Sequence, residues 1–296
     1  MFRTTMRTPG GGFVSALALS LIVLAVNFAH GDDLRDPLAY SLGNKERRSE
    51  VQTDLGVFTL KWSRASETYF GRNPERALAE AAQTVRRALL QASFAPELKS
   101  LSQDWSVVML DEATAQRELS GSLASNCHPG WMVPPSNIYI VAERAAQYCG
   151  GKEVPAALAD RRLAQILIHE IGHAVEFRLM GRAFSGDRMR AEGFASWFEQ
   201  FASEYSSFIP KGFVRAEYRK FLTPDLFQPG WQFGGGAGDY ARAALFFEVV
   251  EKKRGVAGVM GLYRGKRSVP FWDNYLQELS VSPVELDKKL ADLARR

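Results

Sequence analysis

Short apolar runs in the first half of the chain predict β-strands. Residues 51–62 and 105–110 have the length and the β-branched and aromatic composition of strands. Two further runs, 132–133 and 137–141, lie on either side of a Pro-Pro-Ser sequence that is typical of a turn. Together these runs predict a mixed sheet that forms a lobe of about residues 50–155.

A helical period dominates the rest of the chain. Apolar residues recur every three or four positions, and Ser-Pro-Val-Glu at 282–285 forms a capping box before the last such segment. This order predicts an α+β fold in which the sheet lobe is followed by two central helices, at about 158–202, and a helical lobe, at about 203–296. The segments that we expect to be helical are 73–92, 113–119, 161–180, 190–201, 210–222, 239–253, 271–279 and 282–293.

The first 31 residues have the pattern of a secretory signal peptide. Two arginines precede an apolar stretch at 13–28, and small residues then precede an acidic pair. We expect residues 1–31 to be removed on export to the periplasm or the medium, because the apolar stretch is short for a membrane span. An uncleaved N-terminal anchor is the alternative. Residues 32–49 are expected to be a loose polar lead, residues 50–296 form the folded domain, and no other segment is apolar enough to span a membrane.

The charge of the chain argues against some classes of partner. The 296 residues have a formal net charge of +4, and loss of residues 1–31 removes two arginines and no acid, which leaves +2. Nucleic-acid-binding proteins need a concentrated basic surface, so such a partner is not expected. The sequence does not indicate an oligomeric state.

Cys127 and Cys149 are the two cysteines of the chain. In an exported protein such a pair predicts a disulfide. It would close a loop of about 22 residues and contribute roughly 3 kcal/mol in the chain-entropy model. A metal site made with His128 is the competing interpretation, but that set lacks a fourth ligand at conventional spacing.

The sequence His-Glu-Ile-Gly-His at 169–173 carries the strongest chemical signal. Residues four apart share one face of an α-helix, so His169 and His173 can bind one ion, and two imidazole nitrogens suit Zn²⁺. Glu170 is then placed to accept a proton from water at the metal, as in metalloproteases. The alternative is a pair of structural histidines, but two histidines in so apolar a helix are costly to bury unless something satisfies them.

Glu192 is the best candidate for a third ligand. A catalytic zinc ion usually has three protein ligands and one open position. Glu192 lies in the apolar segment 190–201, eighteen residues beyond His173, and glycines in between allow the chain to reverse. Two helices packed antiparallel across that turn would bring Glu192 towards both imidazoles.

The spacing and its surroundings resemble the gluzincin metallopeptidases. His-Glu-x-x-His, eighteen residues and then Glu in an Ala-Glu-Gly-Phe-Ala-Ser-Trp-Phe-Glu sequence is similar, over residues 163–201, to the zinc aminopeptidases of that clan. The resemblance implies a zincin-like peptidase domain and a peptide or protein substrate. It also implies a zinc ion on His169, His173 and Glu192.

The resemblance extends to one more helix and omits two features. Residues 238–248 resemble the Tyr-x-Lys-Gly-Ala helix of the clan, which implies that Tyr240 donates a hydrogen bond to the oxyanion.

Ser196 replaces the Asp that orients a ligand His in thermolysin-type members. Glu199 either supports the site or faces solvent, and we favour solvent. The Gly-x-Met-Glu-Asn motif, with which the aminopeptidases hold a free amine, is absent, so the sequence does not indicate aminopeptidase specificity.

We therefore expect a zinc-dependent peptide-bond hydrolase with Glu170 as general base. In the clan an edge strand beside the metal binds extended peptide, and residues 131–133 and 138–141 are both candidates for that edge. Two alternatives stay open, a non-catalytic zincin-fold binding module of the cell envelope and a zinc hydrolase of a non-peptide amide. The same ligands would also take Co²⁺ or Mn²⁺.

A glycine-rich stretch at 234–238 precedes Tyr240. No strand precedes it, so it does not indicate a dinucleotide site, and we expect a loop at the mouth of the cleft. Trp231 and Phe233 would either line a subsite there or anchor the loop.

Overall fold

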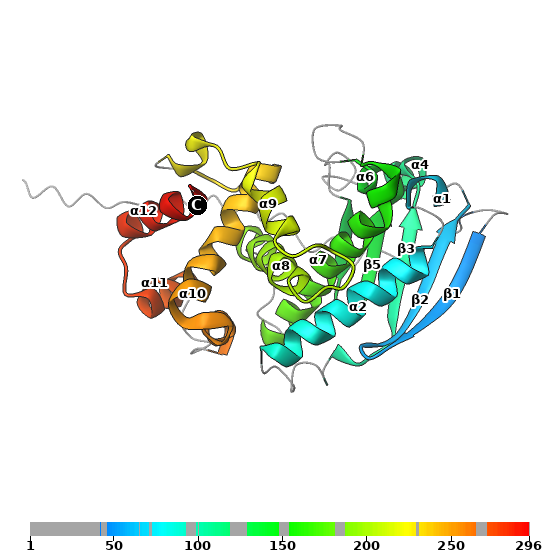
Figure 1. The fold of residues 1–296 in the computed structure, drawn as a ribbon, viewed down its shortest axis with the longest axis horizontal. Helices are drawn as coiled ribbons and strands as arrows, with labels where there is room; N and C mark the ends of the chain where they lie inside the picture. Colours follow the sequence, from blue (N-terminus) through cyan, green and yellow to red (C-terminus); the bar gives the residue numbers. More distant parts are fainter. Residues whose placement is uncertain are drawn as a thin grey trace, which may run out of the picture.

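The protein has an α+β fold with a five-stranded sheet and a largely helical remainder (Figure 1). The computed structural model describes residues 42, 46–64, 66–70, 73–92, 99, 101–118, 129–147, 154–180, 187–228, 231–264 and 271–295. The predicted signal peptide, almost all of the lead before residue 46, and both cysteines lie outside the described residues. Within them, no helix has the length and apolar composition that a membrane span requires.

Within the described residues, the five strands precede residue 142 and the later regular elements are helices. The strands are β1 (Glu46–Thr53), β2 (Gly56–Ser63), β3 (Trp105–Leu110), β4 (Gly130–Val133) and β5 (Asn137–Val141). The helices are α1 (Glu67–Phe70), α2 (Pro74–Gln91), α4 (Glu112–Glu118), α6 (Ala142–Ala145), η3 (Ala156–Leu158), α7 (Ala159–Met180), α8 (Arg188–Ser203), α9 (Phe213–Arg219), η5 (Pro224–Phe227), α10 (Ala237–Arg264), α11 (Phe271–Leu279) and α12 (Pro283–Ala294).

The sheet has the strand order β1-β2-β3-β5-β4. β2, β3 and β5 are parallel, and the two edge strands, β1 and β4, are antiparallel to their neighbours. The sheet is therefore mixed, as predicted. It also decides between the two candidate edges, because residues 131–133 lie in the edge strand β4 and residues 138–141 lie inside the sheet.

Alternate residues of the strands face two different layers, as the period of two in a strand requires. Phe58, Val107 and Ile138 belong to the main core, which also contains the apolar faces of α2 and α7. Val108 and Tyr139 belong to a smaller core on the other face, which includes Ala115 of α4. Figure 1 shows α2 and α7 lying across the sheet, with α8 between them and the helices α10 to α12.

Local signals predicted several helix ends correctly. Asn73 caps α2 by accepting a hydrogen bond from the amide of Arg76 at 2.9 Å, and Pro74 occupies the first turn. The capping box between Ser282 and Glu285 is present at the start of α12.

Other boundaries differ from prediction because distant or irregular backbone decides them. β1 begins at Glu46, inside the predicted lead, since it pairs with β2 over its whole length. Polar residues are compatible with that strand because it is at an edge. α9 begins at Phe213 and not at 210, because Gly212 adopts φ 71° and the chain turns there. α10 runs on to Arg264, across a non-helical residue at Gly255.

α8 packs against both α7 and α10. Gly193 allows the second contact, because a Cβ atom at this position would lie 2.9 Å from the carbonyl oxygen of Ala243 in α10. The two backbones therefore meet directly beside Glu192. This close approach brings the start of α10, with Tyr240, near the predicted ligands.

Candidate metal centre

The three predicted ligands lie together between α7 and α8. Nε2 of His169 and Nε2 of His173 are each 3.4 Å from Oε2 of Glu192. One donor atom from each residue lies within 4.8 Å of the other two. We call the space between these three donor atoms the focus. Contacts between the helices occur in reverse order along α7 and α8, so the helices are antiparallel as expected; the pairs are Gln165–Glu199, His169–Glu192 and Glu176–Arg190.

Glu199 holds the ring of His169 from behind. Its Oε2 atom lies 3.1 Å from Nδ1 of His169, and its Oε1 atom accepts a hydrogen bond from Nε2 of Gln165 at 2.6 Å. Glu199 is only 3% exposed, so our prediction that it faces solvent is wrong. With the Nδ1 proton donated to Glu199, the lone pair of His169 is on Nε2 and points to the shared focus, which is the arrangement of a ligand histidine.

Tyr218 completes the set of donors around Glu199. Its hydroxyl donates to Oε2 of Glu199 at 2.6 Å. Burial raises the pKa of Tyr218 well above its ordinary value, and the negative charge of Glu199 acts in the same direction, so the phenol stays a donor. Glu199 therefore receives hydrogen bonds from an imidazole, an amide and a phenol.

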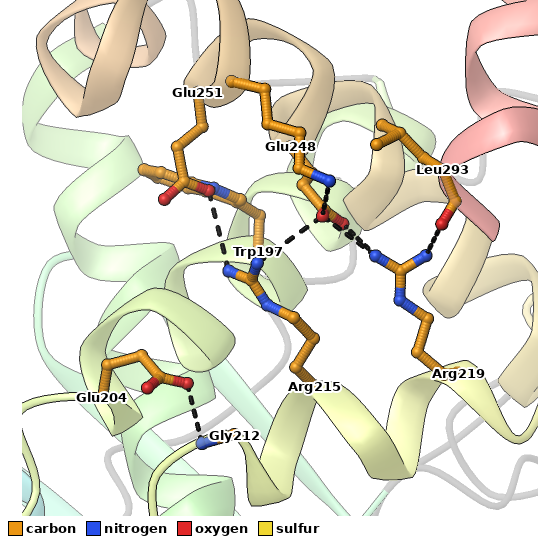
Figure 2. A network of polar contacts seen from close by, with 9 residues as sticks. Trp197, Glu204, Gly212, Arg215, Arg219, Glu248, Glu251 and Leu293 are labelled. Carbon is orange, nitrogen blue, oxygen red and sulfur yellow. Dashed lines mark hydrogen bonds and ion pairs between the residues drawn. The ribbon is translucent and has the colours of Figure 1, made fainter. Parts of the chain in front are cut away.

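A polar network holds α9 and thereby Tyr218 in place (Figure 2). Arg219 donates to both carboxylate oxygens of Glu248 in α10, at 2.9 and 2.8 Å. Arg215 forms ion pairs with Glu248 at 3.5 Å and with Glu251 at 3.8 Å. Because Tyr218 lies between these two arginines in sequence, the network connects α10 to the support of the candidate centre.

Glu170 is buried next to the focus, at 3% exposure. A Cβ atom on Gly130 would lie 2.8 Å from Oε1 of Glu170, so the edge strand β4 begins directly against this carboxyl group. Its Oε2 atom is buried without a hydrogen-bond partner among the described groups. Burial raises the pKa of Glu170 to about 7, although the neighbouring histidines act in the opposite direction.

The electrostatics favour positive charge at the focus. Burial lowers the pKa of His169, but hydrogen bonds with Glu192 and Glu199 outweigh this effect and raise the pKa to about 10. Burial acts to raise the pKa of Glu192, but hydrogen bonds from the two histidines hold it well below its ordinary value. Two imidazoles and the carboxylates around them thus fit a divalent cation, and the unpartnered oxygen of Glu170 suits a bound water.

Tyr240 lies beside the first histidine. Its ring is in the first turn of α10, with the ring centroid 6.3 Å from that of His169 and 5.4 Å from that of Phe233. The phenol ring of Tyr240 is therefore close to the candidate ligands. Its role as a hydrogen-bond donor to the substrate stays a prediction.

The sequence contained a signal for some of the residues that we missed. Gln165 precedes His169 by four residues and Glu199 follows Glu192 by seven, so both lie on the same helix faces as the ligands they adjoin. Tyr218 has no such signal, because it is on a different helix. The predicted disulfide between Cys127 and Cys149 falls outside the described residues.

No protein-family model and no curated protein matches the sequence. The chain is similar to the crystal structure of an M1 zinc metallopeptidase from Deinococcus radiodurans, with 14% sequence identity, a TM-score of 0.42, and coverage of 83% of this chain and 50% of that chain. The chain thus spans about half the length of that protein. The function proposed below rests on the site itself.

Proposed function

We propose that this protein is a zinc-dependent hydrolase of peptide bonds. The observation that carries the proposal is the convergence of His169, His173 and Glu192 on one focus, with Glu199 behind His169. A zinc-bound imidazole usually donates its other ring N–H to a carboxylate, and this contact fixes the orientation of the ring. Three protein donors leave one coordination position open, which is the feature of catalytic zinc sites.

Each nearby side chain has a role in this proposal. Zinc held by the three ligands would supply a Lewis acid that makes water more acidic and draws charge from the scissile carbonyl group. Glu170 accepts the proton of the attacking water and passes it to the leaving amine, because its carboxyl group is buried beside the focus with a free oxygen. Tyr240 donates a hydrogen bond to the developing oxyanion.

The edge strand β4 supports a peptide as substrate. An extended peptide can add to an exposed sheet edge through main-chain hydrogen bonds. β4 is an edge strand of the described sheet, and Gly130 at its start is against Glu170. A peptide paired with β4 would therefore pass the general base, which is an arrangement that a non-peptide amide does not require.

Metal analysis combined with a peptide-cleavage assay tests the proposal. Purified protein should contain about one equivalent of zinc and should cleave members of a quenched-fluorescent peptide library, and a chelator should abolish cleavage reversibly. One bound equivalent of metal without cleavage of any peptide would instead favour the non-catalytic binding module. Cleavage of cell-wall amides alone would favour the non-peptide hydrolase.

A further inference from the structure

A permanent positive charge lies at the rim of the candidate metal centre. Arg188 is in the first turn of α8, one turn before Glu192, and its side chain is 33% exposed. Nε of Arg188 is 4.0 Å from Oε1 of Glu192, while Oε2 of Glu192 faces the imidazoles. This distance is too long for a hydrogen bond, so the two groups interact through charge.

Arg188 is the first residue of α8 and directly follows the capping residue Asp187. A cation in the first turn opposes the helix dipole, and α8 has no acidic residue in that turn. The other arginine of the turn, Arg190, is explained by a buried pair with Glu176 at 2.9 Å. Arg188 instead lies 4.0 Å from Glu192 and over the ring of Phe233, on the side of α8 that carries the candidate ligand.

Aromatic rings connect Arg188 to the metal ligands. Its guanidinium carbon lies 5.4 Å from the ring centroid of Phe233, and Phe233 contacts Tyr240 edge-on at 5.4 Å. The ring of Tyr240 is in turn beside His169. Gly235, with φ 88°, lies against the guanidinium, since a Cβ atom there would be 2.9 Å from one of its terminal nitrogens. The side chains of Arg188, Phe233 and Tyr240 thus contact one another in series beside His169, and we call this row of side chains the wall.

The loop that carries Phe233 is held in a defined shape. Asp239 accepts hydrogen bonds from the amides of Gly234 and Gly236, at 3.1 and 2.9 Å, and from Nε1 of Trp231 at 2.8 Å. The guanidinium carbon of Arg242 lies 4.1 Å from the ring centroid of Trp231. Trp231 therefore anchors the loop, whereas Phe233 faces the site. The wall is built by the fold and does not depend on a bound substrate.

We infer that Arg188 binds a carboxylate of the substrate close to the scissile bond, so that the enzyme prefers peptides that are acidic there. This inference rests on the proposed function and names its substrate class. A guanidinium presents paired donors that match a carboxylate, and a site beside a ring is partly shielded from water. The carboxylate comes from an Asp or Glu side chain, or from the C-terminus of the peptide. This preference is opposite to that of an enzyme that holds a free amine with acidic groups.

Matched peptides test the preference directly. One set of three peptides is derived from a peptide that the wild type cleaves, and its members carry Glu, Gln or Lys within two residues of the cleaved bond. A second set of two peptides ends within two residues of that bond, either in a free carboxylate or in an amide. Wild type should favour Glu over Gln roughly tenfold in kcat/KM, the scale of a hydrogen bond to a charged group. Arg188→Gln should remove the preference and Arg188→Glu should shift it to Lys. The free-acid pair shows whether a terminal carboxylate serves as well.

A matched control removes a different exposed arginine. Arg86, on α2, forms an ion pair with Asp54 at 3.1 Å and takes no part in the wall. Arg86→Gln should keep the wild-type preference for Glu. An equal preference in Arg188→Gln and wild type would overturn the inference and leave the proposed hydrolysis intact.

Binding without turnover separates this inference from the proposed function. In a Glu170→Gln background, fluorescence anisotropy should show tighter binding of the Glu peptide than of the Gln peptide, and added Arg188→Gln should abolish the difference. At saturating zinc, metal analysis should still give about one equivalent in Arg188→Gln, so that the binding difference is measured on loaded protein. Arg188-dependent binding of acidic peptides without any cleavage by wild type would refute the hydrolysis alone. Equal binding of Glu and Gln peptides would refute the role of Arg188.

Discussion

The antiparallel pair α7 and α8 contains a buried carboxylate, Glu176, and a half-buried one, Glu192, which differ in what balances their charge. At one place Glu176 accepts from Nε of Arg190 at 2.9 Å and from the hydroxyl of Tyr263 at 2.8 Å. At the other, Glu192 contacts the imidazoles of His169 and His173. Arginine is always charged in proteins, whereas an imidazole carries positive charge only when it is protonated.

The same two helices therefore contain one carboxylate whose charge a fixed cation balances and one whose charge a proton or a metal ion can balance. At Glu176 the negative charge is balanced within the protein, because Oε1 accepts from a permanent cation and a phenol, while Oε2 is buried without a hydrogen-bond partner among the described groups. At Glu192 the protein brings together acidic groups and imidazoles, so the charge balance depends on a proton or a metal cation. The first arrangement should govern stability and the second should govern metal binding and catalysis.

The largest expected effect is on catalysis at the second place. Glu170→Gln should retain about one equivalent of zinc and should lose roughly 10²- to 10⁴-fold in kcat, because the amide cannot accept a proton from water. Peptide-cleavage kinetics and metal analysis on the same sample measure both properties. Hydrolysis at the wild-type rate would remove Glu170 from the mechanism.

At the first place the expected effect is on folding. Arg190→Met should lower the free energy of unfolding by roughly 3–5 kcal/mol, because it leaves Glu176 buried without its cation. The double variant Glu176→Leu with Arg190→Met should recover most of this loss, since no buried charge is left uncompensated. Urea unfolding of the single and double variants measures the difference. A single variant as stable as wild type would show that the pair is not structural.

A smaller effect should follow from removing the charge behind His169. Glu199→Gln should weaken zinc binding roughly 10- to 100-fold, the usual effect of losing an outer partner of a metal ligand. Competition with a chelating dye gives the affinity. Glu278→Gln is the control, because Glu278 is exposed and forms an ion pair with Arg254 of α10. Equal zinc affinity in both variants would contradict the orienting role.

The smallest effect should come from the phenol that supports Glu199. Tyr218→Phe removes one of several donors to this carboxylate, so zinc affinity should fall only about 3- to 10-fold, below the effect of changing Glu199 itself. Tyr205→Phe, a change in a ring that packs on Phe201 at 5.4 Å, is the control. A loss larger than that of Glu199→Gln would mean that Tyr218 acts by another route.

The sequence predicted the features that neighbouring residues determine. Asn73 and Pro74 start α2 through local hydrogen bonding, and the spacing of His169 and His173 places both on one face of α7. Glu192 could be predicted as a ligand because few residues separate α7 from α8 in the sequence.

Features that depend on distant partners were missed. Tyr218 reaches Glu199 only because α9 is tied to α10. β1 is a strand through its pairing with β2 and not through its own polar sequence. Glu199 was assigned to solvent although its spacing places it on the face of Glu192, because its partners Gln165 and Tyr218 lie on other helices.

The absence of a side chain at Gly193 makes interhelical distance an adjustable property of this protein. A methyl group there would act as a wedge against the backbone of α10 and would move Glu192 relative to Tyr240 without altering the chemistry of either group. The size of ion that the ligands accept, and the reach of the phenol towards the reacting carbonyl, would then change together. A Gly193→Ala substitution would therefore change the geometry of the proposed metal site from a position that is not itself a ligand.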